Sequence, residues 1–335
     1  MKLATVCLWR DDPDAFVTEV QDADALGYEM ICVGDSQSVY REVYVSLAVA
    51  ALHSSRARLG PMVTNPITRH PAVTASAIAT IDELSGGRAI MGIGTGDSAV
   101  RNLRHRPATL AELERYVTAV QRLTRGEDIE YDGVSVHTRW ASRPVPVYVT
   151  AEGPKTIRMA GRVADGVVLH TGTDPVIIAD SLRLLHEGAA EAGRDPDDID
   201  VWLFLKAGIG DTHEEAVDGI KMGLAGSAHH AFRFTLEGKH VPDALAPAVK
   251  ELVHRYETQA HEVWDGANRH LTDELGLTDY LADRFGVIGT PNECIERLRA
   301  VQAAGIDNVL IAALGPDPLG VVRRFGHDVM PAIDG

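Results

Sequence analysis

The stretch LGPMVTNPITRHPAVTASAIATIDELSGGRAIMGIGTGDSAV, residues 59–100, decides the fold. A short apolar run at 58–62 begins one residue before this stretch. A longer amphipathic run at 71–84 and a second apolar run at 89–93 follow it. Two short apolar runs separated by an amphipathic helix are typical of parallel strands joined by a right-handed crossover. The stretch therefore predicts one strand–helix–strand unit.

The same alternation continues on both sides of this unit. Six further short apolar runs bring the predicted strands to eight; they lie at 2–7, 30–33, 145–150, 166–170, 201–206 and 308–312. Helical patterns follow them, at 13–26, 41–54, 108–124, 153–163, 175–192, 211–224, 291–304 and 318–330. Eight strand–helix units predict an α/β protein with a (β/α)8 TIM barrel. A doubly wound sheet is the alternative, because periodicity alone does not establish that the sheet closes.

Helix punctuation supports this scheme. Asp12 followed by Pro13 supplies an N-cap and a proline at the first helical position, and Gly27 supplies a C-cap for the same helix. Thr290 before Pro291 opens a later helix in the same way. These residues fix the ends of two predicted helices.

Two segments interrupt the rhythm within what we expect to be a single domain, 1–335. Residues 126–143 are too many for a simple connector, and a small hairpin is expected there. Residues 225–284 are far longer and carry helical patterns with several histidines. An insertion of this size in a barrel usually builds a lid or an oligomer contact. The histidines have no spacing suited to a metal, so no metal site is expected.

Composition excludes several classes of function. The 335 residues include 32 basic and 48 acidic side chains, a formal net charge of −16. This charge disfavours nucleic acid and anionic membranes as partners. No apolar run approaches the roughly 20 residues that span a bilayer, and the N-terminal run is too short for a signal peptide. Three isolated cysteines give no disulfide framework. A cytoplasmic protein is the simplest expectation.

In a barrel of this kind, catalytic groups lie on loops at the carboxyl ends of the strands. The fourth predicted strand ends in a glycine turn with Gly96 and Asp97, which we take as candidate ligand contacts. The sixth ends in His170. A histidine at the barrel mouth suits acid–base work, because its ordinary pKa lies near neutral pH.

A phosphate site is predicted where the fifth strand meets the helix after it. Ala151, Glu152 and Gly153 precede that helix, so free backbone amides and the positive end of the helix dipole lie at the strand end. Thr171 and Gly172 lie one strand over and offer a hydroxyl and an amide. Glu152 is repulsive to phosphate, so either its side chain points away or Lys155 compensates.

The stretch quoted above resembles the deazaflavin-dependent methylenetetrahydromethanopterin reductases, within the luciferase-like superfamily. The glycine–proline turn before KTIRMAGRVADGVVL and the segment GVIGTPNECIERL resemble the same group. The resemblance covers most of the chain and is weak in 225–284. It implies that an isoalloxazine-like ring lies across the barrel mouth.

By this resemblance, a bulge with a non-prolyl cis peptide supports the ring from behind. The bulge matches Met62 and Val63, beside Thr64 and Asn65; without the resemblance, the segment reads as an ordinary loop. Asp35 is expected near the ring or the substrate, or alternatively as a helix N-cap. Related enzymes often carry histidine after this aspartate, where this chain has Ser36.

Four functions compete at this stage. The first is hydride transfer between coenzyme F-420, an 8-hydroxy-5-deazaflavin, and a small organic substrate. The second is an FMN-dependent monooxygenase on the same scaffold. The third is a non-catalytic flavin-binding barrel. The fourth is a phosphate-binding lyase or isomerase, for which the strands offer no catalytic pair.

The resemblance also implies a homodimer. Members of the superfamily usually pair through helices near the second and third strands. In this chain the runs 44–52 and 72–81 are rich in Ala, Val and Ile, as a closely packed helix surface would be. The alternative is that both runs are buried against the barrel alone.

Overall fold

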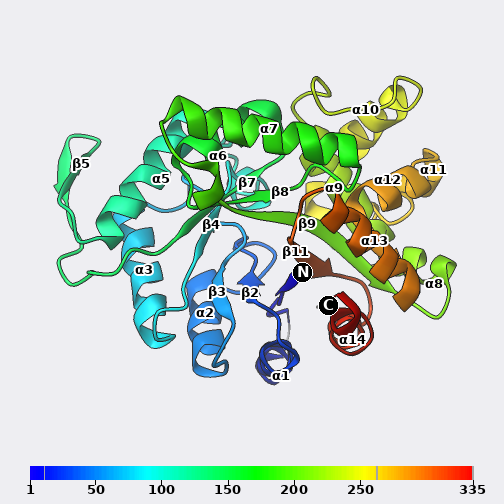
Figure 1. Ribbon diagram of the computed structural model, residues 1–335, viewed down its shortest axis with the longest axis horizontal. Helices are drawn as coiled ribbons and strands as arrows, with labels where there is room; N and C mark the ends of the chain where they lie inside the picture. The colour runs from blue at the N-terminus through cyan, green and yellow to red at the C-terminus, as the bar shows by residue number, and fades with distance from the viewer. Residues whose placement is uncertain (11, 262, 334–335) are drawn as a thin grey trace.

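The computed structural model describes residues 1–10, 12–261 and 263–333. Its core is a ring of parallel strands, as predicted (Figure 1). They are β1 (Lys2–Val6), β2 (Met30–Val33), β3 (Arg58–Pro61), β4 (Met91–Ile93), β7 (Val147–Ala151), β8 (Gly166–Leu169), β9 (Asp200–Ile209) and β11 (Asn308–Ala313).

The ring closes, which confirms a barrel over a doubly wound sheet. The strands pair in the order β3-β2-β1-β11-β9-β8-β7-β4. Two isolated parallel bridges, Leu59 with Ala89 and Thr64 with Ile93, then join β3 to β4. The prediction failed at one strand, β10 (Gly286–Gly289), which pairs with the far end of β9. Its sequence GVIG has glycine at both ends, and glycine weakens the strand signal.

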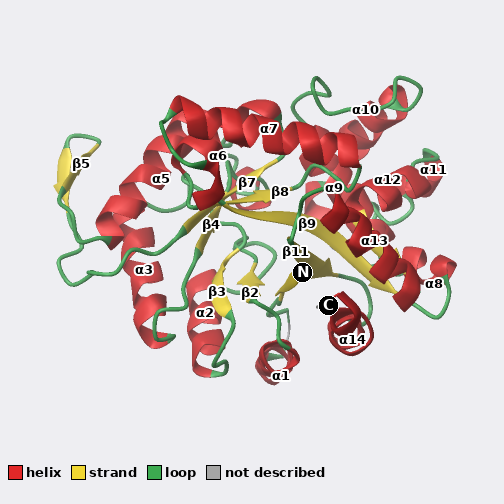
Figure 2. Cartoon of the chain, viewed as in Figure 1, coloured by secondary structure: helices red, strands yellow, loops and turns green. Residues whose placement is uncertain are grey.

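Helices surround the barrel (Figures 1 and 2). Those that follow barrel strands are α1 (Pro13–Leu26), α2 (Val43–Leu52), α3 (Pro71–Leu84), α4 (Ser98–Arg101), α5 (Leu110–Thr124), α6 (Pro154–Val163), α7 (Pro175–Glu191), α8 (His213–Asp218), α13 (Pro291–Ala303), α14 (Pro318–Arg324) and α15 (Met330–Ile333). A π-turn at Phe325–Val329 joins the last two. The helix predicted at 211–224 is wrong in extent, because α8 ends at Asp218, with Gly219 as its C-cap, and a new helix begins at Lys221; glycine is a poor helix former.

The predicted caps are confirmed. Asp12 accepts a hydrogen bond from the amide of Asp14 at the start of α1, and Gly27 ends α1 with φ of 94°. Thr290 forms a capping box with Glu293 at the start of α13. These helix ends lie where the local sequence predicts them.

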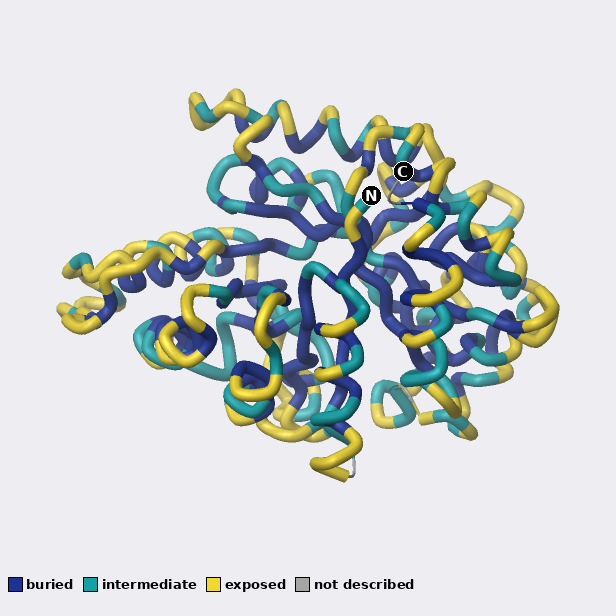
Figure 3. The backbone as a smooth tube through the Cα atoms, turned by 60° about the horizontal axis from the view of Figure 1, so that its bottom comes forward, coloured by how far each residue is buried: buried dark blue, intermediate teal, exposed yellow. Residues whose placement is uncertain are grey.

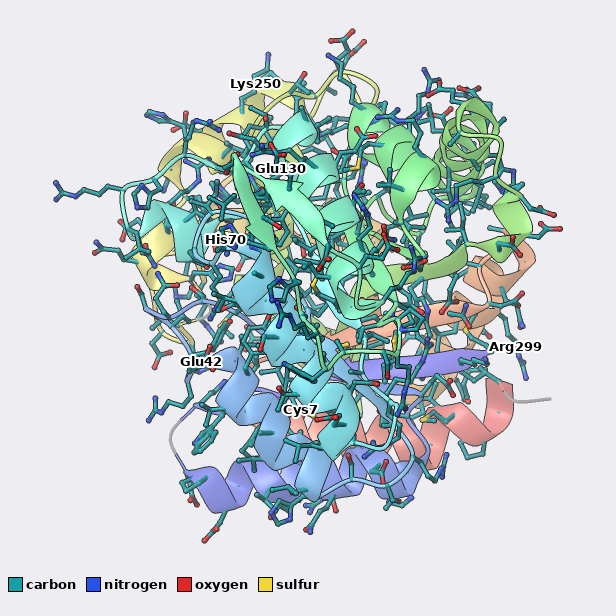
Figure 4. All side chains as sticks on the ribbon, turned by 90° about the vertical axis from the view of Figure 1, so that its left-hand side faces the viewer. Cys7, Glu42, His70, Glu130, Lys250 and Arg299 are labelled. Atoms are coloured by element: carbon teal, nitrogen blue, oxygen red, sulfur yellow. The ribbon has the colours of Figure 1, made fainter. Side chains whose placement is uncertain are left out.

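The hairpin expected at 126–143 is present. It consists of β5 (Ile129–Tyr131) and β6 (Val134–Val136), paired antiparallel. Its two turn residues, Asp132 and Gly133, both have positive φ, as in the tight turns that favour this pair. Figure 4 views the molecule from this side, with Glu130 on the hairpin and His70 at the start of α3. The His70 ring lies edge-on to Tyr131, with centroids 5.3 Å apart.

The segment 225–284 carries most of α9 (Lys221–Phe232) and all of α10 (Ala246–Arg255) and α11 (Leu271–Glu274). It ends within α12 (Thr278–Phe285), and α10 and α12 both pack on α9. The four helices lie together at one side of the barrel (Figure 1). None of the helices in the described residues is long and apolar enough to cross a membrane.

Apolar side chains form two clusters on opposite faces of the strands. Leu3 on β1 packs in the cluster beneath the outer helices, whereas its neighbour Ala4 faces the barrel interior. The interior cluster includes Trp202 and continues into the helices of the insertion. Figure 3 shows the buried backbone at the centre and the exposed segments on the outer turns. This alternation follows from the two-residue period of a strand.

Candidate functional site

A cavity of about 760 Å³ lies at the carboxyl ends of the barrel strands. Its walls come from the segments that follow β2, β3, β4, β7 and β8, together with residues of the insertion between 230 and 239. This is where barrel enzymes place their chemistry. Most of the predicted site residues line this cavity, which we call the mouth cavity.

The wall after β3 contains the predicted bulge. The peptide bond between Met62 and Val63 is cis, as expected from the resemblance. The amide of Thr64 donates to the carbonyl of Gly92 at 3.0 Å, and the amide of Gly94 donates to the carbonyl of Thr64 at 3.0 Å. Backbone bonds to the β4 segment therefore hold the bulge on both sides.

Asn65 completes this wall. Its Oδ1 accepts from the amides of Ile67 and Thr68, each at 3.0 Å. Its Nδ2 is buried and has no partner among the described residues. Met62, Val63 and Asn65 line the mouth cavity. A buried donor without a partner is uncommon in proteins, and here it belongs to a cavity-lining residue.

Asp35 is buried after β2 and lines the mouth cavity. Its carboxylate accepts from Arg69 at 2.6 Å and from the hydroxyl of Thr64 at 2.6 Å. The N-cap of α2 is Glu42, not Asp35. Asp35 is therefore neither a helix cap nor a free carboxyl, and it ties the β2 loop to the buried Thr64 of the bulge.

The glycine turn after β4 is tied to the insertion. Gly96 has φ of 96°, a conformation that favours glycine. Asp97 lies 2.9 Å from Nε of Arg101, 3.1 Å from Nδ1 of His230 and 3.6 Å from Arg233. Gly96 and Asp97 both line the mouth cavity. The Asp97 carboxylate is thus surrounded by basic groups.

The turn before α6 forms another part of the wall. Gly153 is the N-cap residue and is extended, with no side-chain cap on the helix. Glu152, Gly153 and Lys155 line the mouth cavity, whereas Ala151 is buried behind them. The open helix start supplies amides and a partial positive charge at the cavity surface.

Glu152 and His170 form a buried pair in this wall. Nδ1 of His170 lies 3.2 Å from Oε1 of Glu152. Burial acts to raise the pKa of Glu152, but the hydrogen bond from His170 and the charge of Arg233 outweigh it and lower the pKa to about 2. Burial lowers the pKa of His170. At neutral pH the carboxylate is therefore ionised and the imidazole is neutral, with its proton on Nδ1.

The other nitrogen of His170 is consequently an acceptor. Nε2 is buried and lacks a hydrogen-bond partner in the part of the chain that the structure describes. The ring packs edge-on to Phe204, with centroids 5.1 Å apart, and His170 lines the mouth cavity. His170 thus keeps one hydrogen-bonding position unused.

Four of the predicted residues do not line the mouth cavity: Thr64 and Ala151 are buried behind its wall, and Thr171 and Gly172 lie to one side of it. Thr171 lines a separate space of about 20 Å³ and accepts from Ser181 at 3.3 Å. Gly172 has φ of 122°, and a Cβ there would lie 2.8 Å from Cγ of Arg284. The wall of Thr171 and Gly172 is therefore filled by Arg284.

Sequence reasoning missed Arg233 and Lys239, which the insertion contributes to the mouth cavity. Both side chains are largely buried. Both are basic residues in a strongly acidic chain, which could have drawn attention to them. Neither lies near the end of a predicted strand, so the sequence around them did not link them to the site. The described residues hold no cluster of three or more His, Cys, Asp or Glu suited to a metal.

The luciferase-like monooxygenase family matches residues 1–308. The 5,10-methylenetetrahydromethanopterin reductase of Archaeoglobus fulgidus is 29% identical over 324 residues, 94% of each chain. The F420-dependent glucose-6-phosphate dehydrogenase of Intrasporangium calvum is 29% identical over 348 residues, 96% of each chain.

Solved structures agree with these matches. The coenzyme F420-dependent tetrahydromethanopterin reductase of Methanopyrus kandleri gives a TM-score of 0.77 at 25% identity, covering 99% of both chains. The oxygenating constituent of 3,6-diketocamphane monooxygenase of Pseudomonas putida, solved with FMN, gives a TM-score of 0.67 at 15% identity over 99% of this chain and 98% of that one, a likeness of fold alone. The match along nearly the whole chain and the barrel with its cis peptide lead to one conclusion: this chain belongs to the luciferase-like monooxygenase family.

Proposed function

We propose that the chain is an oxidoreductase that transfers hydride between the deazaflavin coenzyme F-420 and a small organic substrate. The observation that carries this proposal is a large mouth cavity backed by the bulge at Met62 and Val63 and bounded by the open start of α6. The relatives that are similar along 94% or more of the chain include F420-dependent enzymes. When bound, the coenzyme supplies the hydride chemistry.

The residues present fit such a coenzyme. Nδ2 of Asn65 and Nε2 of His170 offer a donor and an acceptor that are otherwise unused among the described residues. A ring with polar edges would satisfy groups of this kind. We assign Met62, Val63, Asn65, Gly96 and Asp97 to the ring region, with Thr64 behind the bulge. The turn Ala151, Glu152 and Gly153 would receive the phosphate.

Two residues have distinct roles in this proposal. His170 accepts or returns a proton at Nε2, because Glu152 holds the proton on Nδ1. Asp35 acts through Thr64, which it fixes beneath the bulge. Arg69 and Thr64 already occupy the Asp35 carboxylate, so a positioning role suits it better than proton transfer.

An FMN-dependent monooxygenase is the second candidate. It is favoured by the family to which the chain belongs and by the open start of α6, which suits the phosphate of either coenzyme. The two candidates differ in their use of oxygen, which the family membership does not decide.

Spectroscopic titration of the purified protein with each coenzyme tests the proposal. We expect F-420 to bind more tightly than FMN, with turnover of reduced F-420 that does not require oxygen. Tighter binding of FMN, with oxygen consumed by the reduced flavin, would favour the monooxygenase. Binding of neither would contradict both candidates.

The quaternary state and the compartment belong to the same proposal. Val45 and Leu52 on α2 and Val73 on α3 are 56%, 68% and 56% exposed, which suits helices that pack against a second copy. We propose a homodimer through these helices; a monomeric mass in light scattering at micromolar concentration would contradict it.

Three free, buried cysteines suit the cytoplasm. A single domain, with 225–284 as its insertion, completes the proposal.

A further inference from the structure

Cations gather where the insertion meets the start of α6. Arg233, Lys239 and Arg284 lie in this corner with the carboxylates of Glu152 and Asp180, and Arg233 also lies 3.6 Å from Asp97. Glu152 is already hydrogen-bonded to His170. Asp180 pairs with Arg183 and His240, so neither Lys239 nor Arg284 has a carboxylate ion-pair partner among the described residues.

Lys239 is the cation nearest the turn. A Cβ placed on Gly153 would lie 3.4 Å from Cε and 3.8 Å from Nζ of Lys239. The loop packs tightly here, since a Cβ on Gly238 would lie 2.9 Å from Cγ of Pro154, the first residue of α6. The insertion thus places an ammonium group beside the open helix start.

The Lys239 side chain is 8% exposed, and its ammonium donates to the carbonyl of Ala231. Within residues 1–10, 12–261 and 263–333 no carboxylate forms an ion pair with it. Burial lowers its pKa, Glu152 opposes this effect and Arg233 and Arg284 add to it. A buried ammonium without a counter-ion is costly, so the site suits an anion.

Arg284 holds the Lys239 loop in place. Its guanidinium donates to the carbonyls of Lys239 at 2.6 Å, His240 at 3.3 Å and Thr171 at 3.2 Å. It also donates to the hydroxyl of Tyr280 at 2.7 Å. These bonds join the insertion to the end of β8 and leave the guanidinium little capacity for a ligand. Arg284 is a positioning residue for Lys239.

Two further groups line the same cavity with unused hydrogen-bonding positions. The Arg233 side chain is 8% exposed, and its buried Nε has no partner among the residues described. Nε2 of His170 is also buried without a partner among the described residues, and the His170 side chain is 8% exposed. Both are independent of the helix start, and both indicate that a polar ligand completes this corner.

We propose that Lys239, positioned by Arg284, is the cationic ligand of the coenzyme phosphate at the start of α6. The inference rests on the proposed function and adds a residue of the insertion to the site. It also accounts for Glu152: His170 binds its carboxylate, and Lys239 rather than the exposed Lys155 offsets its charge.

The test measures how much the phosphate contributes to binding. FMN and riboflavin differ by this group alone, so this pair isolates the phosphate; F-420 carries a further tail on its phosphate and is titrated beside them. Lys239→Met is expected to weaken binding of FMN or F-420 by about 10- to 100-fold, as expected for a lost charge-assisted hydrogen bond. Binding of riboflavin should stay within about twofold of the parent.

Lys155→Met is the matched control, because it removes the same charge from the first turn of α6, close to Gly153. It should change FMN binding by less than about threefold. Lys239→Arg retains the charge and should recover most of the affinity. It also keeps the proposal falsifiable if Lys239→Met does not fold.

Equal losses for FMN and riboflavin would show that Lys239 only supports the loop, and no loss for either would place the phosphate elsewhere; both results overturn the inference. A parent that binds neither coenzyme would refute the proposed function separately. Inorganic phosphate decides the inference in that case. If it raises the melting temperature only when Lys239 is present, the anion site stands without a coenzyme. If it has no effect, the site is refuted too.

Discussion

The two ends of the barrel differ in how many hydrogen bonds their polar side chains make, although Nε of Arg58 at the floor also lacks a hydrogen-bond partner among the described residues. At the floor, Asp200 accepts from Tyr148 at 2.6 Å, from Trp202 at 3.0 Å and from Arg58 at 3.3 Å, while its second oxygen accepts from Asn308 at 3.1 Å. At the mouth, Asn65, His170 and Arg233 each keep a buried polar atom without a partner in the described residues.

This difference separates stability from function. Hydrogen bonds at the floor are made among residues of four strands, so they contribute to folding. The unused positions at the mouth cost free energy in the protein alone and are of use only to a ligand. We therefore expect substitutions at the floor to change stability and substitutions at the mouth to change binding.

The largest effect is expected at Asp200. Asp200→Ala removes the acceptor of four donors, one of them a cation, and should reduce the free energy of unfolding by about 2–4 kcal/mol. This loss is smaller than for a fully buried carboxylate, because the Asp200 side chain is 33% exposed and water can reach the donors that it leaves. Urea denaturation measures this loss, and coenzyme affinity at 25 °C should remain within about twofold of the parent.

Asp198→Ala is the matched control, two residues earlier and exposed. Its effect on stability should lie within about 0.5 kcal/mol. If Asp200→Ala weakened coenzyme binding more than it weakened the fold, the division between floor and mouth would be wrong.

Periodicity and punctuation were sufficient to predict most of the fold. The alternation of short and long apolar runs located the eight barrel strands, and Asp12, Gly27 and Thr290 located helix ends. The prediction failed where tertiary pairing overrode local sequence. β9 extends to Ile209 only because β10 pairs with it, and no property of the sequence GVIG announces that partner.

At the mouth, the second largest effect is expected at Gly153. Gly153→Val should weaken coenzyme binding by about 10- to 100-fold, because the added methyl groups meet Lys239 and occupy the phosphate position. The backbone there is extended, with φ of −142°, so valine fits it without backbone strain, and the loss of stability should stay at about 1 kcal/mol, the cost of a poorer N-cap. Titration with F-420 and FMN, beside a thermal melt, measures both quantities. Unchanged affinity would place the phosphate elsewhere.

Strand ends alone were enough to predict several residues that line the mouth cavity, and they missed the residues that distant segments bring to it. Strand-end reasoning found Gly96, Gly153 and His170, all of which line the mouth cavity. It did not find Lys239, which reaches Gly153 only through the folding of the insertion. It also placed Thr171 and Gly172 opposite the phosphate, where the structure has Arg284. Sequence shows where a strand ends and does not show which distant side chain fills the space beside it.

Helix α1 carries the same contrast in two acidic residues. Asp24 lies near the C-terminal end of α1, and its carboxylate accepts from three amides and a hydroxyl. These bonds lower the pKa of Asp24, although burial acts to raise it. Burial raises the pKa of Glu19 to about 7, with Arg10 and the backbone of Leu8 acting against it. Leu8 lines the mouth cavity. Glu19 is therefore the poorly satisfied member of the pair.

The pH dependence of stability follows from Glu19. Its pKa is higher in the folded than in the unfolded state, so its contribution is present below about pH 4.5 and is lost as pH rises through about 7. Glu19→Gln keeps the acceptor for Leu8 and should stabilise the protein by about 1–2 kcal/mol at pH 8, with little effect at pH 5. Asp24→Asn is the control and should destabilise at both values. An equal effect of Glu19→Gln at pH 5 and pH 8 would exclude titration of this carboxyl.

The smallest effect is expected at Thr171, and it decides which wall of the mouth holds the phosphate. The Thr171 hydroxyl accepts from Ser181 and lines a space of about 20 Å³, enough for about one water molecule, behind the turn before α6. Thr171→Val keeps the shape of the side chain and removes this one neutral hydrogen bond, which contributes about 0.5–1.5 kcal/mol to stability. Coenzyme affinity should change by less than about twofold, since Arg284 rather than the ligand contacts this strand end. Ser181→Ala removes the same bond together with the bond from Ser181 to the carbonyl of Ile177 at 2.7 Å, so it should give an equal or larger loss of stability without a change in affinity. A tenfold loss of affinity in Thr171→Val alone would instead mean that the phosphate displaces the Arg284 side chain and binds between Thr171 and Gly153.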